Sequence, residues 1–65
     1  MNIKLRRLRL EKGVSQREVA EAIGVTLSAY SNYEQGLREP SYIILKNICK
    51  YFKVTADYLI GVDEK

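Results

Sequence analysis

Residues 16–35 read QREVAEAIGVTLSAYSNYEQ, and this stretch decides the fold because one glycine separates two short helical patterns. In the first pattern, Val19 and Ile23 are four residues apart, so their side chains share one face of a helix. Gly24 follows directly, and a glycine in the left-handed conformation commonly ends a helix. The first of the two helices is therefore expected to end beside Gly24.

The second pattern places Tyr30 and Tyr33 three residues apart, on one face of a second helix. Val25 is expected to fill the corner between the two helices, and Ala20 is small enough to let them cross closely. Two short helices joined by such a turn are typical of a helix-turn-helix, whose second helix is suited to the major groove of DNA.

Hydroxyl side chains mark the starts of the predicted helices. Ser15 precedes the first helix of the stretch and is followed three residues later by Glu18, which is the spacing of a capping box. Thr26 is the expected N-cap of the second helix. Ser41, directly after Pro40, is the expected N-cap of a later helix.

Three more helices are expected outside the stretch: one from about Asn2 to Lys12 with Gly13 as its stop, one from Ser41 to about Phe52, and a last short helix that Thr55 caps and Gly61 ends. Their inward-facing residues are expected to be Met1, Leu5, Leu8, Ile44 or Leu45, Ile48, Cys49 and Phe52. Ile3 and Leu10 lie off this stripe and are either partly exposed or part of a contact surface. No segment alternates as a strand does. The prediction is an all-α fold, a compact five-helix bundle forming one domain over residues 1–65.

Composition narrows the class of protein. With 46% apolar and 29% charged residues, the chain is expected to be soluble and globular. The apolar run at residues 42–45 is too short for a signal peptide or a membrane span, so a cytoplasmic location without a membrane partner is expected. There is no histidine, and the lone Cys49 has neither a base nor a companion ligand. An enzyme is thus disfavoured, and no metal, cofactor or small-molecule ligand is indicated.

The net charge of +3 is unevenly distributed. Residues 1–17 hold six basic side chains against the single acidic Glu11, and this cluster is explained equally well by solvation or by phosphate binding beside the helix-turn-helix. Lys46, Lys50 and Lys53 form a second cluster at helical spacing. Such a stripe is usually a solvated helix face.

At these spacings, residues 16–35 resemble the helix-turn-helix unit of the phage repressor and Cro family, also called the XRE family. The resemblance covers residues 5–61 and continues at Leu8-Arg9, Lys12-Gly13, Tyr33-Glu34, Gly36, Pro40-Ser41 and Tyr58-Leu59. It implies a DNA-binding domain of the phage-repressor-like type.

The resemblance also implies a salt bridge. In the family, an arginine of the first helix pairs with a glutamate at the end of the recognition helix, and Arg9 and Glu34 stand at the matching positions. They are expected to orient the recognition helix; the alternative is two unrelated surface charges. Tyr30 departs from the aliphatic residue usual in the family. Its hydroxyl is expected either to donate to a phosphate or to be exposed to solvent while the ring packs in the core.

Residues on the outward face of a recognition helix, near its start, read the bases. The expected base contacts are Gln16, Arg17, Leu27, Ser28, Ser31 and Asn32. The amide of Asn32 suits adenine, and Arg17 is the nearest candidate for guanine. Gln16, at the start of the preceding helix, has the same amide chemistry and is expected to reach a base or a phosphate. The competing interpretations are that Gln16 caps or solvates a helix start, that Asn32 is an ordinary exposed residue and that Leu27 is a packing residue.

Phosphate contacts are expected from helix-start amides and from Ser15, Ser28, Tyr30, Arg38 and Ser41. Arg38 alternatively enters a narrow A·T minor groove. These contacts position the domain on the duplex, whereas the base contacts specify the site.

These features predict a sequence-specific regulator of transcription, a repressor that binds double-stranded DNA at a palindromic operator as a homodimer. The dimer surface is expected in the last helix, with Tyr58, Ile60 and Val62, or in residues beyond this sequence. The alternative is a protein-interaction module, an antitoxin or antirepressor, because the recognition helix lacks arginine and lysine. RNA is disfavoured because side chains cannot read the narrow major groove of A-form RNA.

Overall fold

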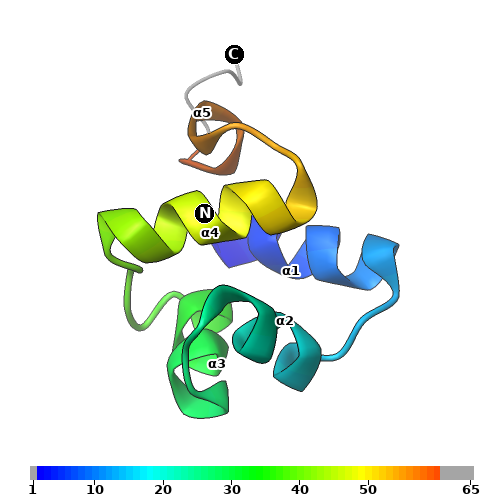
Figure 1. The fold of residues 1–65 in the computed structure, drawn as a ribbon, viewed down its shortest axis with the longest axis vertical. Helices are drawn as coiled ribbons and strands as arrows, with labels where there is room; N and C mark the ends of the chain where they lie inside the picture. Colours follow the sequence, from blue (N-terminus) through cyan, green and yellow to red (C-terminus); the bar gives the residue numbers. More distant parts are fainter. Residues whose placement is uncertain (1, 61–65) are drawn as a thin grey trace.

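The computed structural model describes the backbone of residues 2–60 and the side chains of residues 4–60. This part of the chain contains no strand and five helices: α1 (Asn2–Lys12), α2 (Gln16–Ile23), α3 (Leu27–Gln35), α4 (Tyr42–Phe52) and α5 (Ala56–Ile60) (Figure 1). The predicted all-α fold with five helices is confirmed. The expectations for Met1, Gly61, Val62 and the side chain of Ile3 lie outside the described residues.

Four helix starts are capped by the hydroxyl side chains that mark them in the sequence. Ser15 Oγ accepts a hydrogen bond from the Glu18 amide at 3.1 Å, and Glu18 Oε1 accepts one from the Ser15 amide at 2.9 Å, which completes the capping box. Thr26, Ser41 and Thr55 each accept a hydrogen bond from the amide three residues further on, at 3.1, 3.3 and 3.0 Å. Each cap satisfies an amide that has no partner inside its helix and contributes about 1 kcal/mol.

The turn between α2 and α3 depends on glycine. Gly24 has a φ of +87°, and its amide donates to the Ala20 carbonyl at 3.0 Å. A side chain disfavours this left-handed conformation, so glycine ends α2 here at the lowest conformational cost. Val25 then packs against the core at the corner, as its position in the sequence predicts.

All five helices contribute to one core. Its buried members are Leu5, Val19, Ala20, Ile23, Tyr30, Ile48 and Leu59. Leu8, Ile44 and Leu45 pack against this core while keeping some exposure, as do Cys49 and Phe52. Leu10 is 58% exposed and takes no part in it.

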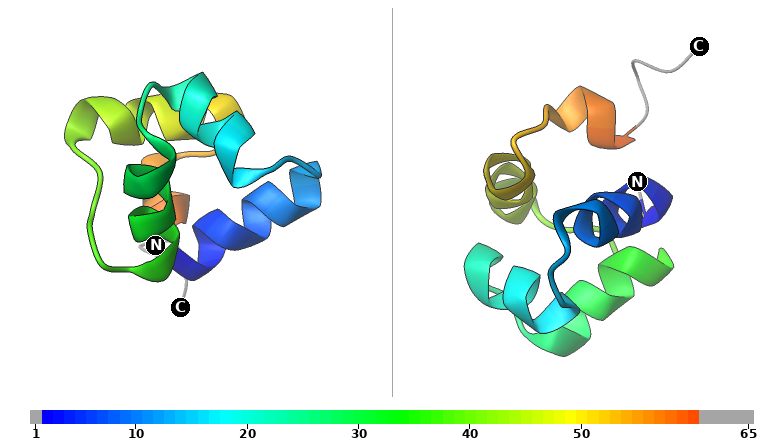
Figure 2. Two further views of the ribbon diagram at one scale, coloured as in Figure 1. Left: turned by 90° about the horizontal axis from the view of Figure 1, so that it is seen from below. Right: turned by 90° about the vertical axis from the view of Figure 1, so that its right-hand side faces the viewer.

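Helix α4 lies between α5 and the α2–α3 pair, and α1 runs beside α4 (Figure 1 and Figure 2). Figure 1 shows α4 across the middle of the molecule, with α2 and α3 on one side and α5 on the other. The right-hand view of Figure 2 shows the same separation of α5 from the α2–α3 pair. Because α3 packs mainly against α1 and α2, its remaining side is open to solvent. No helix within residues 2–60 has the length and apolar character needed to cross a membrane.

Candidate nucleic-acid interface

Helix α3 has one face in the core and one face open. Tyr30 is fully buried and Glu34 is 8% exposed, and the two lie one helical turn apart. The four residues of this helix that the sequence assigns to base contact all keep exposed surface: Leu27, Ser28, Ser31 and Asn32. Within the described part of the chain, the side chains of Ser28 and Asn32 have no recorded hydrogen bond, which leaves their polar groups available to a ligand.

The Glu34 carboxylate is the centre of a polar network that joins three helices. Glu34 Oε2 accepts hydrogen bonds from Arg9 Nε and from the Tyr30 hydroxyl, each at 2.6 Å. Glu34 Oε1 accepts hydrogen bonds from Gln16 Nε2 at 3.0 Å and from Arg9 Nη2 at 3.3 Å. Arg9 also donates through Nη1 to the Val14 carbonyl at 3.1 Å. The four donors fill the acceptor sites of the carboxylate, so the network ties α3 to both α1 and α2.

The network contains the salt bridge that the family resemblance implies. The Arg9 and Glu34 side chains are 13% and 4% exposed, so the pair is largely removed from water. Burial opposes ionisation of Glu34, but the hydrogen bonds from Arg9, Tyr30 and Gln16 outweigh it and lower the pKa of the carboxyl group. The hydrogen bond to Glu34 raises the pKa of Arg9. The pair is therefore ionised at neutral pH and holds the end of α3 against α1.

The structure corrects the expectation for Tyr30. Its side chain is fully buried and its hydroxyl donates to Glu34, so it cannot also donate to a phosphate. The physical reason is local, because Glu34 lies one turn further along the same helix and offers a strong acceptor inside the protein. Burial, followed by the hydrogen bond to Glu34, raises the pKa of Tyr30, which keeps its hydroxyl protonated.

Sequence reasoning missed the contact between Gln16 and Glu34. Gln16 is the first residue of α2 and is half-buried, with its amide nitrogen directed to the carboxylate at the end of α3. The two residues are 18 positions apart, so only the packing of α2 on α3 brings them together. No local sequence signal reports such a contact. The neighbouring Arg17 is exposed.

The three other side chains assigned to phosphate are also exposed. Ser15 and Ser41 use their Oγ atoms to cap α2 and α4, which leaves each hydroxyl hydrogen free to donate. Arg38 lies exposed in the loop between α3 and α4. The starts of α2, α3 and α4 add unpaired amides and a partial positive charge, which together favour a phosphate.

Part of the amino-terminal basic cluster is used inside the fold. Lys4 donates to the Tyr58 carbonyl at 3.0 Å, and Lys12 lies over the Tyr51 ring with its Nζ 5.0 Å from the ring centre. These contacts join α1 to α4 and α5, so this part of the amino-terminal cluster supports packing. Arg6 and Arg7 of the same helix are exposed.

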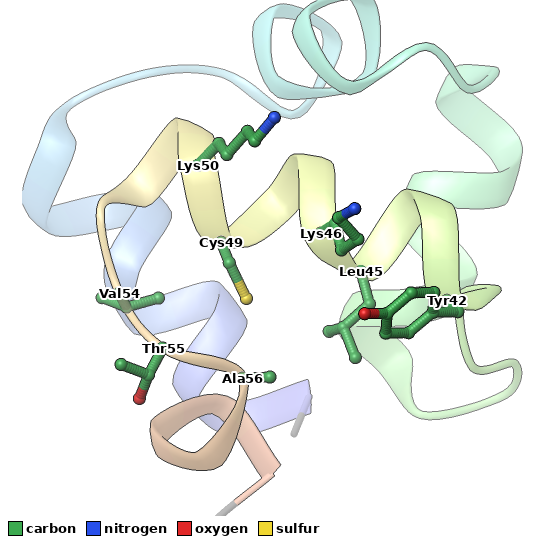
Figure 3. Close-up of a pocket in the computed structure, with 8 residues that line it drawn as sticks. All are labelled: Tyr42, Leu45, Lys46, Cys49, Lys50, Val54, Thr55 and Ala56. Atoms are coloured by element: carbon green, nitrogen blue, oxygen red, sulfur yellow. The ribbon is translucent and has the colours of Figure 1, made fainter.

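The lysine stripe at residues 46–53 is exposed and borders an apolar hollow. A pocket of about 290 Å³ lies between α4 and α5, with Lys46 and Lys50 among its lining residues. Figure 3 shows the Cys49 sulfur directed into this space, and the ammonium groups of both lysines directed away from it. Burial raises the pKa of the Cys49 thiol, so it is protonated at neutral pH and a poor nucleophile.

Comparison with protein families places this geometry in a known group. Residues 5–59 match the model of a family described as helix-turn-helix. The chain is 40% identical over 63 residues to the HTH-type transcriptional activator BcrR of Enterococcus faecalis, covering 97% of this chain and 31% of that protein. It is 34% identical over 67 residues to the transcriptional repressor RstR of the cryptic phage CTXphi from Vibrio cholerae, covering 95% of this chain and 60% of the relative.

A solved structure shares the arrangement of helices. The crystal structure of the clp gene regulator ClgR from Corynebacterium glutamicum superposes with a TM-score of 0.84 and 32% sequence identity. The match covers 92% of this chain and 64% of that chain. The chain thus spans between about a third and two thirds of the length of these similar proteins.

Proposed function

Because the chain belongs to the helix-turn-helix family, in its phage-repressor or XRE branch, we propose that it is a transcriptional regulator that binds double-stranded DNA sequence-specifically. The observation that carries the proposal is the division of α3 into two faces. Its inward face is fixed to α1 and α2 through Glu34, and its outward face carries Ser28 and Asn32, whose side chains have no partner in the described structure. A rigid helix with such an outer face is suited to reading the major groove.

The outward face of α3 supplies the proposed base contacts. Asn32 offers an amide that can pair with N6 and N7 of adenine, and Leu27 offers methyl groups that suit the thymine methyl. Ser28 and Ser31 add hydroxyl groups, and the helix itself has no guanidinium or ammonium group. We therefore propose half-sites that are A·T-rich at their centre, with guanine confined to an edge within reach of Arg17.

Phosphate contacts are proposed on both sides of α3. Ser15 precedes α2, and Ser41 and Arg38 follow α3, so the three residues frame the recognition helix along the chain. Together with the helix-start amides and Ser28, they would fix the register of the domain on the duplex without selecting its sequence.

One domain of this size makes few contacts, so we propose that two copies bind a palindromic operator in the cytoplasm. Ile60 of α5 is 50% exposed and is available for contact between copies, whereas Tyr58 is half-buried and interacts with Lys4. For the sign of regulation we propose repression. RstR is named a repressor and BcrR an activator, so the sign is to be tested separately from DNA binding.

A second function is favoured by one surface feature. Leu37, Tyr42 and Ile43 are 69%, 74% and 70% exposed, and all three lie in or directly after the loop that follows α3. Exposed apolar side chains in one segment favour a protein partner. The second candidate is therefore a protein-interaction module, an antitoxin or antirepressor, that keeps the helix-turn-helix scaffold.

Selection of bound sequences from random duplex DNA, followed by affinity measurements over a range of salt concentrations, separates the two functions. A DNA-binding regulator is expected to enrich a consensus, and its affinity should fall linearly on a log–log salt plot. Two symmetric half-sites about one helical turn apart would support the dimer. Absence of both an enriched sequence and a salt-dependent affinity would overturn the proposal and favour the protein-interaction module.

A further inference from the structure

Among the predicted base readers, Gln16 has a side chain that a partly buried charged group of the described structure holds. Its Nε2 lies 3.0 Å from Glu34 Oε1, and the contact is partly buried. An ionised carboxylate has only acceptor atoms, whereas an amide has a donor end and an acceptor end. The amide of Gln16 must therefore turn its nitrogen toward Glu34, because the opposite orientation would place two oxygen atoms against each other.

Glu34 cannot turn away to release this constraint. Its Oε2 is held by Arg9 Nε and by the Tyr30 hydroxyl, each at 2.6 Å, and its Oε1 is shared between Gln16 and Arg9 Nη2. The side chain is 4% exposed, so water does not compete for these positions. The orientation of the Gln16 amide is thus set by a fixed anion, and the amide cannot flip without losing its partner.

Resting on the proposed DNA-binding function, we propose that Glu34 is a positioning residue that makes Gln16 a reader of exocyclic amino groups in the major groove. With one N–H directed to Glu34, Gln16 keeps its carbonyl oxygen and one N–H for a ligand. The oxygen accepts from adenine N6 or cytosine N4, and the remaining N–H suits adenine N7. Guanine presents two acceptors, O6 and N7, and a fixed Gln16 can no longer donate to both.

The amide of Gln35 also makes a side-chain hydrogen bond, but its partner does not fix which end of the amide faces it. Its Nε2 donates to Ser31 Oγ at 2.9 Å in an exposed contact. A hydroxyl group can donate or accept, so it holds either end of an amide equally well. Gln35 is therefore an internal reference for an amide whose orientation is not fixed.

The test on DNA uses the selected operator with all four base pairs placed at each position in turn. Wild-type protein is expected to prefer adenine or cytosine over guanine by about 5- to 150-fold at one position, and Gln16→Ala should lose this preference there and nowhere else. Operators that carry purine in place of adenine, or 2-pyrimidinone in place of cytosine, lack the amino group and show which base supplies it.

Glu34→Gln provides the decisive variant, since an amide at this position offers both a donor and an acceptor to Gln16. Discrimination against guanine should then fall at the base pair that Gln16 contacts, while the preferences at the base pairs that α3 contacts persist. Glu21→Gln is the matched control, because Glu21 is exposed on α2, and it should leave every preference unchanged.

A measurement without DNA keeps the inference testable if Glu34→Gln does not fold. The side-chain NH₂ signals of Gln16 in the ¹H–¹⁵N spectrum of the free protein should exchange with solvent more slowly than those of Gln35. Equal exchange, a guanine preference at the Gln16 position, or a consensus that Gln16→Ala leaves intact would each overturn the inference while the regulator function stands. If wild-type protein binds all duplexes with the same affinity, the proposed function is overturned, and so is the base contact by Gln16.

Discussion

The inward and outward faces of α3 use polar side chains in opposite ways. On the inward face, Glu34 accepts four hydrogen bonds, and among the described residues no buried side-chain nitrogen or oxygen lacks a partner. On the outward face, Ser28 and Asn32 keep exposed polar groups with no recorded partner in the described structure. The inward groups determine where the helix lies, and the outward groups are left for a ligand. Substitutions on the inward face should therefore lower the stability of the fold, whereas substitutions on the outward face should weaken DNA binding.

The largest effect is expected from Arg9→Ala on the inward face. It leaves the carboxylate of Glu34 buried without its cation, which should lower the free energy of unfolding by about 3–5 kcal/mol in urea denaturation. Arg7→Ala is the control, because Arg7 is exposed on the same helix, and it should change stability by less than about 0.5 kcal/mol. If Arg9→Ala and Glu34→Ala have additive effects in a double-mutant cycle, the two residues are not coupled.

Acid should weaken the same network without a mutation. The pKa of Glu34 is lowered in the folded protein, so the unfolded chain takes up this proton at a higher pH than the folded one. The stabilisation is therefore complete above the ordinary carboxyl pKa of about 4.3 and is lost as the pH falls through the lower folded value. Urea denaturation of wild type and Glu34→Gln should give a stability difference that narrows below about pH 4. A difference independent of pH would show that Glu34 has the same pKa in the folded and unfolded states, so that the network does not lower it.

Tyr30→Phe removes a single donor from the network and keeps the ring. The lost hydrogen bond to a charged group should lower the free energy of unfolding by about 1.5–3 kcal/mol. Tyr33→Phe is the matched control, since Tyr33 is half-buried in edge-to-face contact with Tyr30 and has no recorded hydroxyl partner. The salt dependence of DNA binding should be the same in Tyr30→Phe as in wild type. A weaker dependence of DNA affinity on salt in Tyr30→Phe would show that Tyr30 contacts a phosphate after all.

The sequence predicts local features of the helices well, and it predicts the contacts of the inward face less well. Helix bounds and caps were predicted well because their signals, such as Ser15 with Glu18, lie within one turn. The pairing of Arg9 with Glu34 was available only from the family resemblance, since 25 residues separate them. Periodicity predicted that Tyr30 faces inward but not where its hydroxyl points. The contact of Gln16 with Glu34 depends on how α2 crosses α3, which no residue spacing encodes.

On the outward face, Asn32→Ala should affect binding and not folding. Loss of a bidentate contact to adenine is expected to cost about 1–3 kcal/mol on the selected operator and to relax preference at one base-pair position. Stability should stay within about 0.5 kcal/mol of wild type, because Asn32 has no recorded side-chain partner in the described structure. An unchanged preference at every position would remove Asn32 from the base-reading set.

The smallest effect is expected from Arg38→Ala, which tests the loop beyond the outward face. If Arg38 contacts a phosphate, the variant should bind all duplexes more weakly, with a salt slope shallower by about one unit per subunit and an unchanged consensus. Lys53→Ala removes a charge from the lysine stripe at the residue directly after α4 and should leave the slope as it is, since that stripe is expected to face solvent. A selective loss of affinity for A·T-rich flanks would instead place Arg38 in a narrow minor groove, where it reads the shape of the DNA. The phosphate contact and the minor-groove contact thus differ in a measurable way, because only the second depends on which sequence flanks the half-site.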